Sequence, residues 1–521
     1  MSSEIFVPGS NCWRIERAGK MAVIVDAADY FRIVRDAMLE AKEQIILVGW
    51  DVDPRIMLDP EKADCGIGAQ AGGAPNSLAD FIPWLAQRRP DLRIHLLIWN
   101  MGFLKMLVRG LAVFTLARWR LARHVSIRFD SSHPIGATHH QKIIVIDDAI
   151  AFCGGIDMTS DRWDTPEHRD DEPYRRRPGG RAYAPWHDTT GAVDGAAAAA
   201  LGELARTRWQ LATGRTLPVP AIAAAIWPER LGHFVENRDI AIARTVPKTE
   251  SAEEIREIEA LYVDMIMAAK RMIYADNQYF ASRRIAEALA TRLAEKNGPE
   301  VVIVNPISAD GWLQETAMGS ARAELFFALA EIDKHDRFQI YTPVTKGGTP
   351  IYVHSKLMIV DDRILRVGSS NMNNRSMGLD SECDIAIAAG EGETDPAITE
   401  LREILMAEHL GTTQEIVAQA FEKTGSLIAT VECLRGQGKT LVPFEPGEWS
   451  DATLAIGASG LLDPESVDER FEPVTSRGLF RGFLRRGTRQ LYNDLRERRR
   501  RQRERNRGRW KRKFRELFNR D

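Results

Sequence analysis

Two stretches of this chain combine histidine and lysine in a spacing that suits phosphate chemistry. In "HHQKIIVIDD", His140 and Lys142 stand two residues apart ahead of four aliphatic residues, and in "VHSKLMIVDD" His354 and Lys356 do the same. An aliphatic run of this length predicts a buried strand. Side chains two residues apart on a strand point the same way, so each stretch presents an imidazole and an ammonium together.

These groups could cleave a phosphodiester unaided. Two ammonium groups hold the non-bridging oxygens and stabilise the charge that develops in the transition state. One neutral imidazole can attack phosphorus, and a second, protonated imidazole can donate to the leaving oxygen. The sequence contains no His, Cys or carboxylate cluster at metal-ligand spacing, so we expect no metal and no other cofactor. His168 and His187, which lack counterparts in the second stretch, either line the pocket or serve the fold.

The two stretches belong to a longer internal repeat. The His, the Lys and a following aspartate, Asp147 or Asp361, recur with an offset of 214 residues. We include these aspartates among the catalytic candidates, with a turn-holding role as the alternative. A small-residue turn follows each aspartate, written "GGID" in the first copy and "GSSN" in the second. Ser369 and Asn371 of the second turn are expected to bind the phosphate together with the two lysines.

A nucleophilic imidazole needs a fixed tautomer, which an acceptor on its other ring nitrogen usually sets. Asp188, in "PWHD", follows a charged loop and is the expected partner of His140. Glu382, in "LDSECDIAI", begins the strand after the second small-residue turn and is the expected partner of His354. Each acceptor is thus predicted to serve the histidine of its own copy.

The elements that must position these residues read as two α/β halves. Amphipathic helical patterns precede the apolar strands "QIILVGW" and "RMIYADN", and the strand pairs "RIHLLIW"/"EVVIVNP" and "VSIRFD"/"RFQIYTP" follow. We place the halves at residues 1–225 and 240–430, and a linker with a basic tail at 440–521. If the halves pack about a pseudo-twofold axis, both histidines and both lysines converge on one site between them.

Charge is distributed unevenly along the chain. The net charge is −3, but residues 481–521 contain 18 Lys and Arg against 5 Asp and Glu, which leaves the remainder at −16. The tail predicts a basic amphipathic helix that contacts anionic lipid; a nucleic-acid arm and a solvated arm are the alternatives. Five cysteines without paired spacing and the absence of a signal-peptide pattern favour a cytoplasmic location.

The doubled motif with its "GG" and "GSSN" turns resembles the phospholipase D superfamily over about residues 5–430. The segments "HHQKIIVID", "PWHD", "DNQYF" and "GSSNMNNRSMGLDSE" resemble phospholipases D proper. The resemblance implies two α/β/α sandwich halves with mixed sheets and a phosphohistidine intermediate that water or an alcohol resolves. It also implies that His140 is the nucleophile and His354 the acid. Asp157 departs from the pattern, because Asn371 occupies the same place in the second copy.

The expected function is a lipid phosphodiesterase with transphosphatidylase activity, working peripherally at a membrane. A cardiolipin or phosphatidyl-transferase synthase is one alternative, although such synthases typically carry "N-x-D-x-R-S" where this chain has "NMNNRS". A nuclease of the same superfamily is the other, but the acidic body argues against nucleic acid as a partner. A non-catalytic scaffold ranks last because both motifs are intact. The sequence makes no prediction of oligomeric state.

Overall fold

The computed structural model describes most of the chain up to residue 445. The described ranges are 5–61, 73–100, 112–134, 136–221, 225–249, 252–308 and 319–445, with residues 497, 501, 504 and 508. The predictions for the linker and the basic tail therefore lie almost entirely outside the described residues. No helix within the described ranges is long and apolar enough to cross a membrane.

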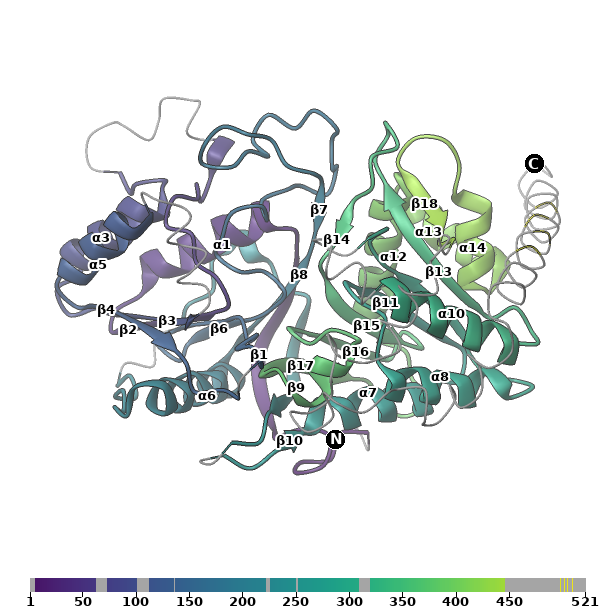
Figure 1. The fold of residues 1–521 in the computed structure, drawn as a ribbon, viewed down its shortest axis with the longest axis horizontal. Coiled ribbons are helices and arrows are strands. Elements are labelled where there is room, and N and C mark those ends of the chain that lie inside the picture. The colour runs from purple at the N-terminus through teal and green to yellow at the C-terminus, as the bar shows by residue number, and fades with distance from the viewer. Residues whose placement is uncertain are drawn as a thin grey trace.

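One mixed sheet of sixteen strands runs through the described part of the chain (Figure 1). The first half contributes β1 (Arg14–Val25), β2 (Gln44–Gly49), β3 (Arg93–Trp99), β4 (Val125–Asp130), β5 (Ile143–Ile146), β6 (Ile150–Gly154) and β8 (Thr189–Asp194). The second contributes β9 (Val235–Val246), β10 (Ile255–Arg256), β11 (Met272–Asn277), β12 (Glu300–Val304), β13 (Phe338–Val344), β15 (Lys356–Val360), β16 (Ile364–Gly368), β17 (Glu382–Ala388) and β18 (Thr440–Pro443).

The strand order repeats on either side of the central antiparallel pair β1–β9. Reading outward, one side runs β8, β6, β5, β2, β3, β4, and the other runs β17, β16, β15, β11, β12, β13. Equivalent strands thus occupy equivalent places, as a duplicated fold requires. The α/β class is confirmed, but the sheets of the two halves join into one. β18 pairs with β13, so the second half continues past residue 430. The pseudo-twofold axis itself stays a prediction.

Helices cover both faces of this sheet in each half (Figure 1). In the first half, α1 (Ala27–Glu40), α3 (Leu78–Arg88) and α5 (Ala112–Leu121) pack on one face, and α6 (Gly195–Thr213) packs on the other. In the second, α7 (Glu257–Ala268), α8 (Arg283–Ala294) and α10 (Ser320–Ile332) face α12 (Pro396–Leu410), α13 (Gln414–Thr424) and α14 (Leu427–Leu434) across the sheet. The apolar faces predicted for α1 and α7 are buried.

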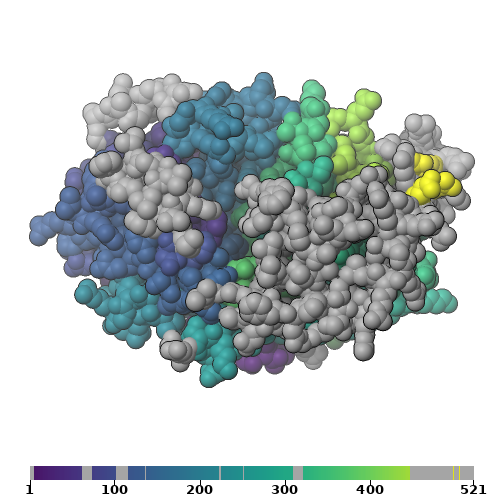
Figure 2. Space-filling model, viewed as in Figure 1, coloured from purple at the N-terminus to yellow at the C-terminus, as the bar shows by residue number. Residues whose placement is uncertain are grey.

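The halves also meet through a small second sheet. β7 (Trp186–His187) pairs in parallel with β14 (Tyr352–Val353), which brings the end of the charged loop of the first half beside the second histidine motif. Asp170 in that loop accepts a hydrogen bond from the backbone N–H of Gly347 at 2.8 Å. In the space-filling view the two halves abut at the upper edge, where these loops meet (Figure 2). The loop is therefore part of the contact between the halves.

The aspartates that follow the two motif strands hold turns, at a distance from the histidines. Asp147 accepts hydrogen bonds from the backbone N–H groups of residues 42, 43 and 44 at 2.6–2.9 Å. Asp361 accepts the equivalent three bonds from residues 270, 271 and 272 at 2.6–2.8 Å. Each lies seven residues, about 20 Å of strand, from its histidine. These contacts are those of the turn-holding alternative, and a catalytic role of the two aspartates stays a prediction.

Replacing Asp361 should cost stability and leave the chemistry intact. The Asp361→Asn protein loses the ionised acceptor of three backbone N–H groups, so we expect its free energy of unfolding to fall by about 2–3 kcal/mol. Urea unfolding measures this loss, with Asp91→Asn on the surface as the control. A large fall in the activity of the remaining folded protein would restore the catalytic role.

Candidate active site

The two motif histidines are each anchored on the opposite half of the molecule. His140 precedes β5, and its backbone N–H donates to the carbonyl oxygen of Ser381 at 3.0 Å. His354 follows β14, and its backbone N–H donates to the carbonyl oxygen of His187 at 2.7 Å. Local strand pairing alone would keep each motif within its own half. These crossing bonds bring both histidines to the boundary between the halves, as the sequence predicted.

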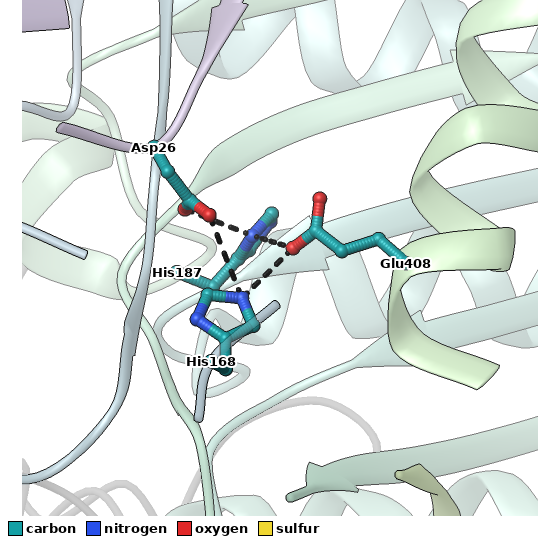
Figure 3. A group of neighbouring side chains, drawn as sticks. All are labelled: Asp26, His168, His187 and Glu408. Carbon is teal, nitrogen blue, oxygen red and sulfur yellow. Dashed lines mark hydrogen bonds and ion pairs between the residues drawn. The ribbon is translucent and has the colours of Figure 1, made fainter. Parts of the chain in front are cut away.

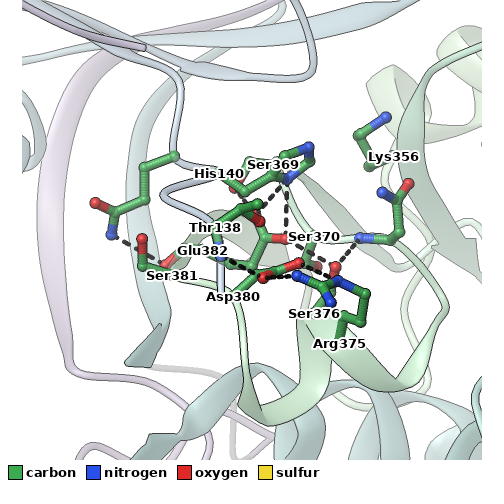
Figure 4. A network of polar contacts seen from close by, with 12 residues as sticks. Thr138, His140, Lys356, Ser369, Ser370, Arg375, Ser376, Asp380, Ser381 and Glu382 are labelled. Atoms are coloured by element: carbon green, nitrogen blue, oxygen red, sulfur yellow. Dashed lines mark hydrogen bonds and ion pairs between the residues drawn. The ribbon is translucent and has the colours of Figure 1, made fainter. Parts of the chain in front are cut away.

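The carboxylates that hold the imidazoles are exchanged between the halves, and Figure 4 shows the pair formed by His140 and Glu382. His140 Nδ1 lies 3.0 Å from both carboxylate oxygens of Glu382. His354 Nδ1 lies 2.6 Å from Asp188 Oδ2. Both acceptors were predicted, but the pairing was wrong. β17 begins beside the approach to β5, and β7 runs beside the approach to β15, so each acceptor reaches the histidine of the other copy.

Glu382 is the centre of a buried hydrogen-bond network (Figure 4). The hydroxyl of Ser369 donates to Glu382 Oε2 at 2.5 Å, and that of Ser376 donates to Oε1 at 2.7 Å. Burial raises the pKa of Glu382 to about 8, against the opposing effects of the Ser369 hydrogen bond and the Lys142 charge. Because its proton is committed to Glu382, the Ser369 hydroxyl positions this carboxylate, and the expected phosphate contact is not supported.

The two lysines are buried and bound differently. Lys142 Nζ donates to the carbonyl oxygen of His140 at 2.9 Å and lies 3.3 Å from Asp157 Oδ2. Lys356 Nζ donates to Gln278 Oε1 at 3.0 Å. Asp157 thus neutralises one ammonium, while a neutral amide contacts the other. The expected asymmetry between the two copies is therefore a difference in charge: Lys142 has a carboxylate against its ammonium group, and Lys356 has a neutral amide.

The charges of the four motif side chains act on one another across the boundary. Burial holds the pKa of His140 well below its usual range, and the charges of Lys142 and then Lys356 lower it further. Burial does the same to His354, followed by Lys356, Arg162 and Lys142. Both imidazoles are therefore neutral in the free site. The lysine of each motif thus lowers the pKa of the histidine of the other motif, in agreement with the backbone contacts that bring the two motifs together.

Sequence reasoning missed several groups beside His354. The guanidinium of Arg162 lies over the ring of Trp186, 4.2 Å from its centroid, and that ring is 5.1 Å from the imidazole of His354. Tyr352 stacks on Trp186 at 4.5 Å. Arg162 lies between β6 and β7, and Ser376 stands 214 residues after it, so the repeat gave no signal for it. Asn371 is buried, and its Oδ1 has no hydrogen-bond partner within the described ranges, so its phosphate contact stays a prediction.

The second glycine of the "GG" turn makes room for an acceptor. A Cβ on Gly155 would meet Asp188 Oδ1 at 2.1 Å. We expect Gly155→Ala to push this carboxylate away from His354 and to lower turnover by at least about 100-fold, the scale of a misplaced catalytic group. Gly179→Ala, whose Cβ meets nothing within 4 Å, is the matched control. Steady-state kinetics of both proteins, with circular dichroism to check folding, measure the difference; equal turnover would contradict the prediction.

Comparison with known proteins agrees with this geometry. Residues 113–221 match the family described as "Phospholipase D", and residues 262–404 match "Cardiolipin synthase, PLD-like domain". The chain belongs to the phospholipase D superfamily.

Individual relatives are distant. Phospholipase D alpha 4 of Arabidopsis thaliana is 23% identical over 79% of this chain and 66% of that protein. Cardiolipin synthase of Halalkalibacterium halodurans is 28% identical over 48% of this chain and 43% of that protein. The chain therefore spans less than two thirds of either relative. The structure of phosphatidylserine synthase from Haemophilus influenzae aligns with a TM-score of 0.47 and 13% identity, covering 85% of this chain and 93% of that one.

Proposed function

We propose that this protein is a phospholipase D-type phosphodiesterase that removes the head group of glycerophospholipids. Phosphatidic acid is the product with water, and a new phosphatidyl ester is the product with an alcohol. The observation that carries the proposal is the pair of histidines, each held by a carboxylate of the opposite half and flanked by a buried lysine. The names of the relatives support phospholipids as the substrate class.

In the proposed first step, His140 Nε2 attacks phosphorus while its Nδ1–H donates to Glu382. The phosphorus–oxygen bond to the head group breaks, and the protonated imidazole of His354 gives its proton to the leaving oxygen. The negative charge of the bound phosphate offsets the lysine charges that lower the pKa of His354, so substrate binding favours the acid form. The product of this step is a phosphohistidine and a free head-group alcohol.

In the second step His354 acts as a base. It takes a proton from water or from an acceptor alcohol, whose oxygen attacks the phosphohistidine and releases His140. The proton that His354 gives to the leaving head group in the first step is replaced in the second step by the proton that it takes from water or the acceptor alcohol, so the reaction needs no other proton. The assignment of nucleophile and acid rests on the family resemblance, since both imidazoles are oriented alike.

We also propose that the protein works peripherally at a cytoplasmic membrane surface, with the basic tail on anionic lipid. Support comes from the charge contrast between residues 481–521 and the acidic body. Replacing four tail arginines by glutamine in the full chain should reduce sedimentation with anionic vesicles and leave turnover of a soluble short-chain phospholipid unchanged. Equal sedimentation would contradict the tail's role.

Mass spectrometry of mixed phospholipid vesicles incubated with the full chain and ethanol tests the proposed function. Phosphatidylethanol formed by the wild type, and absent with His140→Asn, would establish transfer through the enzyme. A synthase acts best with a phosphatidyl-alcohol acceptor, and the match of residues 262–404 to the cardiolipin synthase family favours including phosphatidylglycerol as a second acceptor. No lipid product, with cleavage of an oligonucleotide, would replace the proposal by a nuclease.

Binding of a phosphodiester should weaken as pH rises. Burial lowers the pKa of Lys356 to about 7, helped by Lys142 and opposed by Asp188, so its ammonium is charged below this pH and neutral above it. We expect the inhibition constant of diethyl phosphate, whose own charge is constant, to rise toward about tenfold per pH unit above pH 7. The Lys356→Met protein should bind diethyl phosphate more weakly, and its inhibition constant should not show this rise above pH 7. A constant that stays flat from pH 6 to 9 in the wild type would contradict the prediction.

A further inference from the structure

A buried group of histidines and carboxylates lies beside the active site, and the proposed reaction makes no use of it (Figure 3). It consists of Asp26, His168, His187 and Glu408, which each offer one ligand atom within 4.8 Å of the others. The first three side chains are fully buried, and the side chain of Glu408 is 4% exposed. Sequence spacing gave no hint of this group, because its members are dispersed along the chain.

The separations between these atoms are at or slightly below those of ligands around one small metal ion. His168 Nε2 lies 2.9 Å from Glu408 Oε1 and 3.5 Å from Asp26 Oδ2. His187 Nδ1 lies 2.8 Å from the same Glu408 oxygen and 3.3 Å from Asp26 Oδ1. Neighbouring ligands of a tetrahedral zinc ion, bound at about 2.0–2.2 Å, stand roughly 3.3–3.5 Å apart. Each nitrogen therefore has Asp26 at the spacing of a neighbouring ligand and Glu408 somewhat closer, at hydrogen-bonding distance.

Hydrogen bonding does not account for all of these contacts. His187 Nδ1 is 2.8 Å from a carboxylate oxygen, yet neither ring nitrogen of His187 makes a hydrogen bond of acceptable geometry within the described part of the chain. Asp26 Oδ2 is likewise buried there without a hydrogen-bond partner. Buried polar atoms normally have well-directed hydrogen bonds, so ion pairs this close without that geometry are compatible with a ligand that these atoms could share.

A second layer of carboxylates orients both imidazoles, as is usual around metal-bound histidine. His168 Nδ1 lies 3.0 Å from Asp164 Oδ2, a carboxylate that Arg175 also contacts at 3.1 Å. His187 Nε2 lies 3.4 Å from Asp276 Oδ2. In each ring the nitrogen away from the cluster faces an acceptor, which leaves the other nitrogen available as a neutral ligand.

We propose that Asp26, His168, His187 and Glu408 form a structural zinc site that ties the two halves together. Two imidazole and two carboxylate donors suit Zn²⁺ better than Ca²⁺ or Mg²⁺, which prefer all-oxygen sites. Two carboxylates also balance the charge of the ion. Three ligands come from the first half, and Glu408, on α12, comes from the second. The site would fix the chain at His187. The carbonyl oxygen of His187 accepts a hydrogen bond from the backbone N–H of His354, and the next residue, Asp188, contacts the imidazole of His354.

The competing state of the cluster contains protons in place of the metal. The same carboxylates can hold both imidazoles protonated: although burial opposes it, Asp26, Asp164 and Glu408 raise the pKa of His168 to about 9. Metal and protons would occupy the same nitrogen atoms and cannot be bound together. Direct measurement of metal content therefore separates the two states.

The test uses the full chain purified from medium supplemented with Zn²⁺, because a buried site fills most readily during folding. We expect elemental analysis to find about one zinc per chain in the wild type, and less than about a tenth of that in Glu408→Gln and His168→Gln. His140→Asn and His95→Gln, which alter buried histidines elsewhere, should retain the ion. Loss of the ion with His140→Asn would place it at the catalytic histidines and overturn the proposal.

Cobalt provides a readout that does not depend on variants that fold. Wild-type protein made in Co²⁺ medium should show the intense visible absorption of tetrahedral Co²⁺ with nitrogen and oxygen ligands. It should also unfold at a temperature several degrees higher than protein made in metal-depleted medium. Wild-type protein that contains no zinc and takes up no cobalt would overturn the proposal and leave a protonated ion network. Retention of the metal by both cluster variants would overturn it as well.

Discussion

Asparagine at either motif histidine is expected to lower turnover of phospholipid by at least about 10⁴-fold while the protein stays folded. His140→Asn removes the attacking nitrogen, and His354→Asn removes the proton donor to the head-group oxygen. In each variant the introduced asparagine keeps a polar group of similar size at the site, so the buried hydrogen-bond networks around it should persist. Release of choline from phosphatidylcholine vesicles, with thermal unfolding of each variant, measures the effect.

The two variants should differ on an activated substrate. A p-nitrophenyl phosphodiester has a leaving group that departs without a proton, so His354→Asn should recover most of the lost rate of the first step, seen as a burst of p-nitrophenolate, while the second step, which needs His354 as base, stays slow. His140→Asn should not recover, because no nucleophile is left. Recovery by His140→Asn and failure of His354→Asn would exchange the two roles. Recovery by neither would mean that both histidines are needed before the leaving group departs.

The second large effect is expected at the exchanged carboxylates. Asp188→Asn and Glu382→Gln keep their size but replace one acceptor oxygen by an NH₂ donor, so the tautomer of the imidazole is no longer fixed, and we expect each to lower turnover by about 10²–10⁴-fold. The crossing makes a specific prediction. Asp188→Asn should recover the burst on the p-nitrophenyl substrate, as His354→Asn does, and Glu382→Gln should not.

A surface carboxylate is the control for this pair. Glu203→Gln breaks only an exposed ion pair with Arg14 and should keep wild-type turnover on both substrates. If Asp188→Asn behaved like His140→Asn, and Glu382→Gln like His354→Asn, each acceptor would serve the histidine of its own copy. The contacts at 2.6 Å and 3.0 Å would then not describe the working enzyme.

Much of the fold was predictable because it is repeated in the sequence. The offset of 214 residues defined two halves, and the aliphatic runs defined β5 and β15 at their centres. Patterns of period 3.6 found the buried faces of α1 and α7. These signals are local, since they depend on neighbouring residues of one element. The joining of two sheets through β1 and β9 had no such signal, because any pair of edge strands could have met there.

Most residues of the site were predictable from the sequence, but the contacts between them were less so. Glu382 and Asp188 were found as acceptors, but which histidine each serves is decided by contacts between segments more than 160 residues apart. Ser369 lies in the turn where a phosphate contact was expected, and only the placement of Glu382 shows where its proton goes. Arg162 has a serine, Ser376, at the repeat offset, so comparison of the two copies could not identify it.

Because the carboxylates are exchanged, the active site is complete only when the two halves are docked together. If either half tilts away, His140 loses Glu382 and His354 loses Asp188 in the same movement. No arrangement leaves the nucleophile poised while the acid is idle, so a reactive phosphohistidine cannot be formed by a partly assembled molecule. During refolding, hydrolysis should therefore appear in a single step with docking of the halves, after most of the secondary structure has already returned.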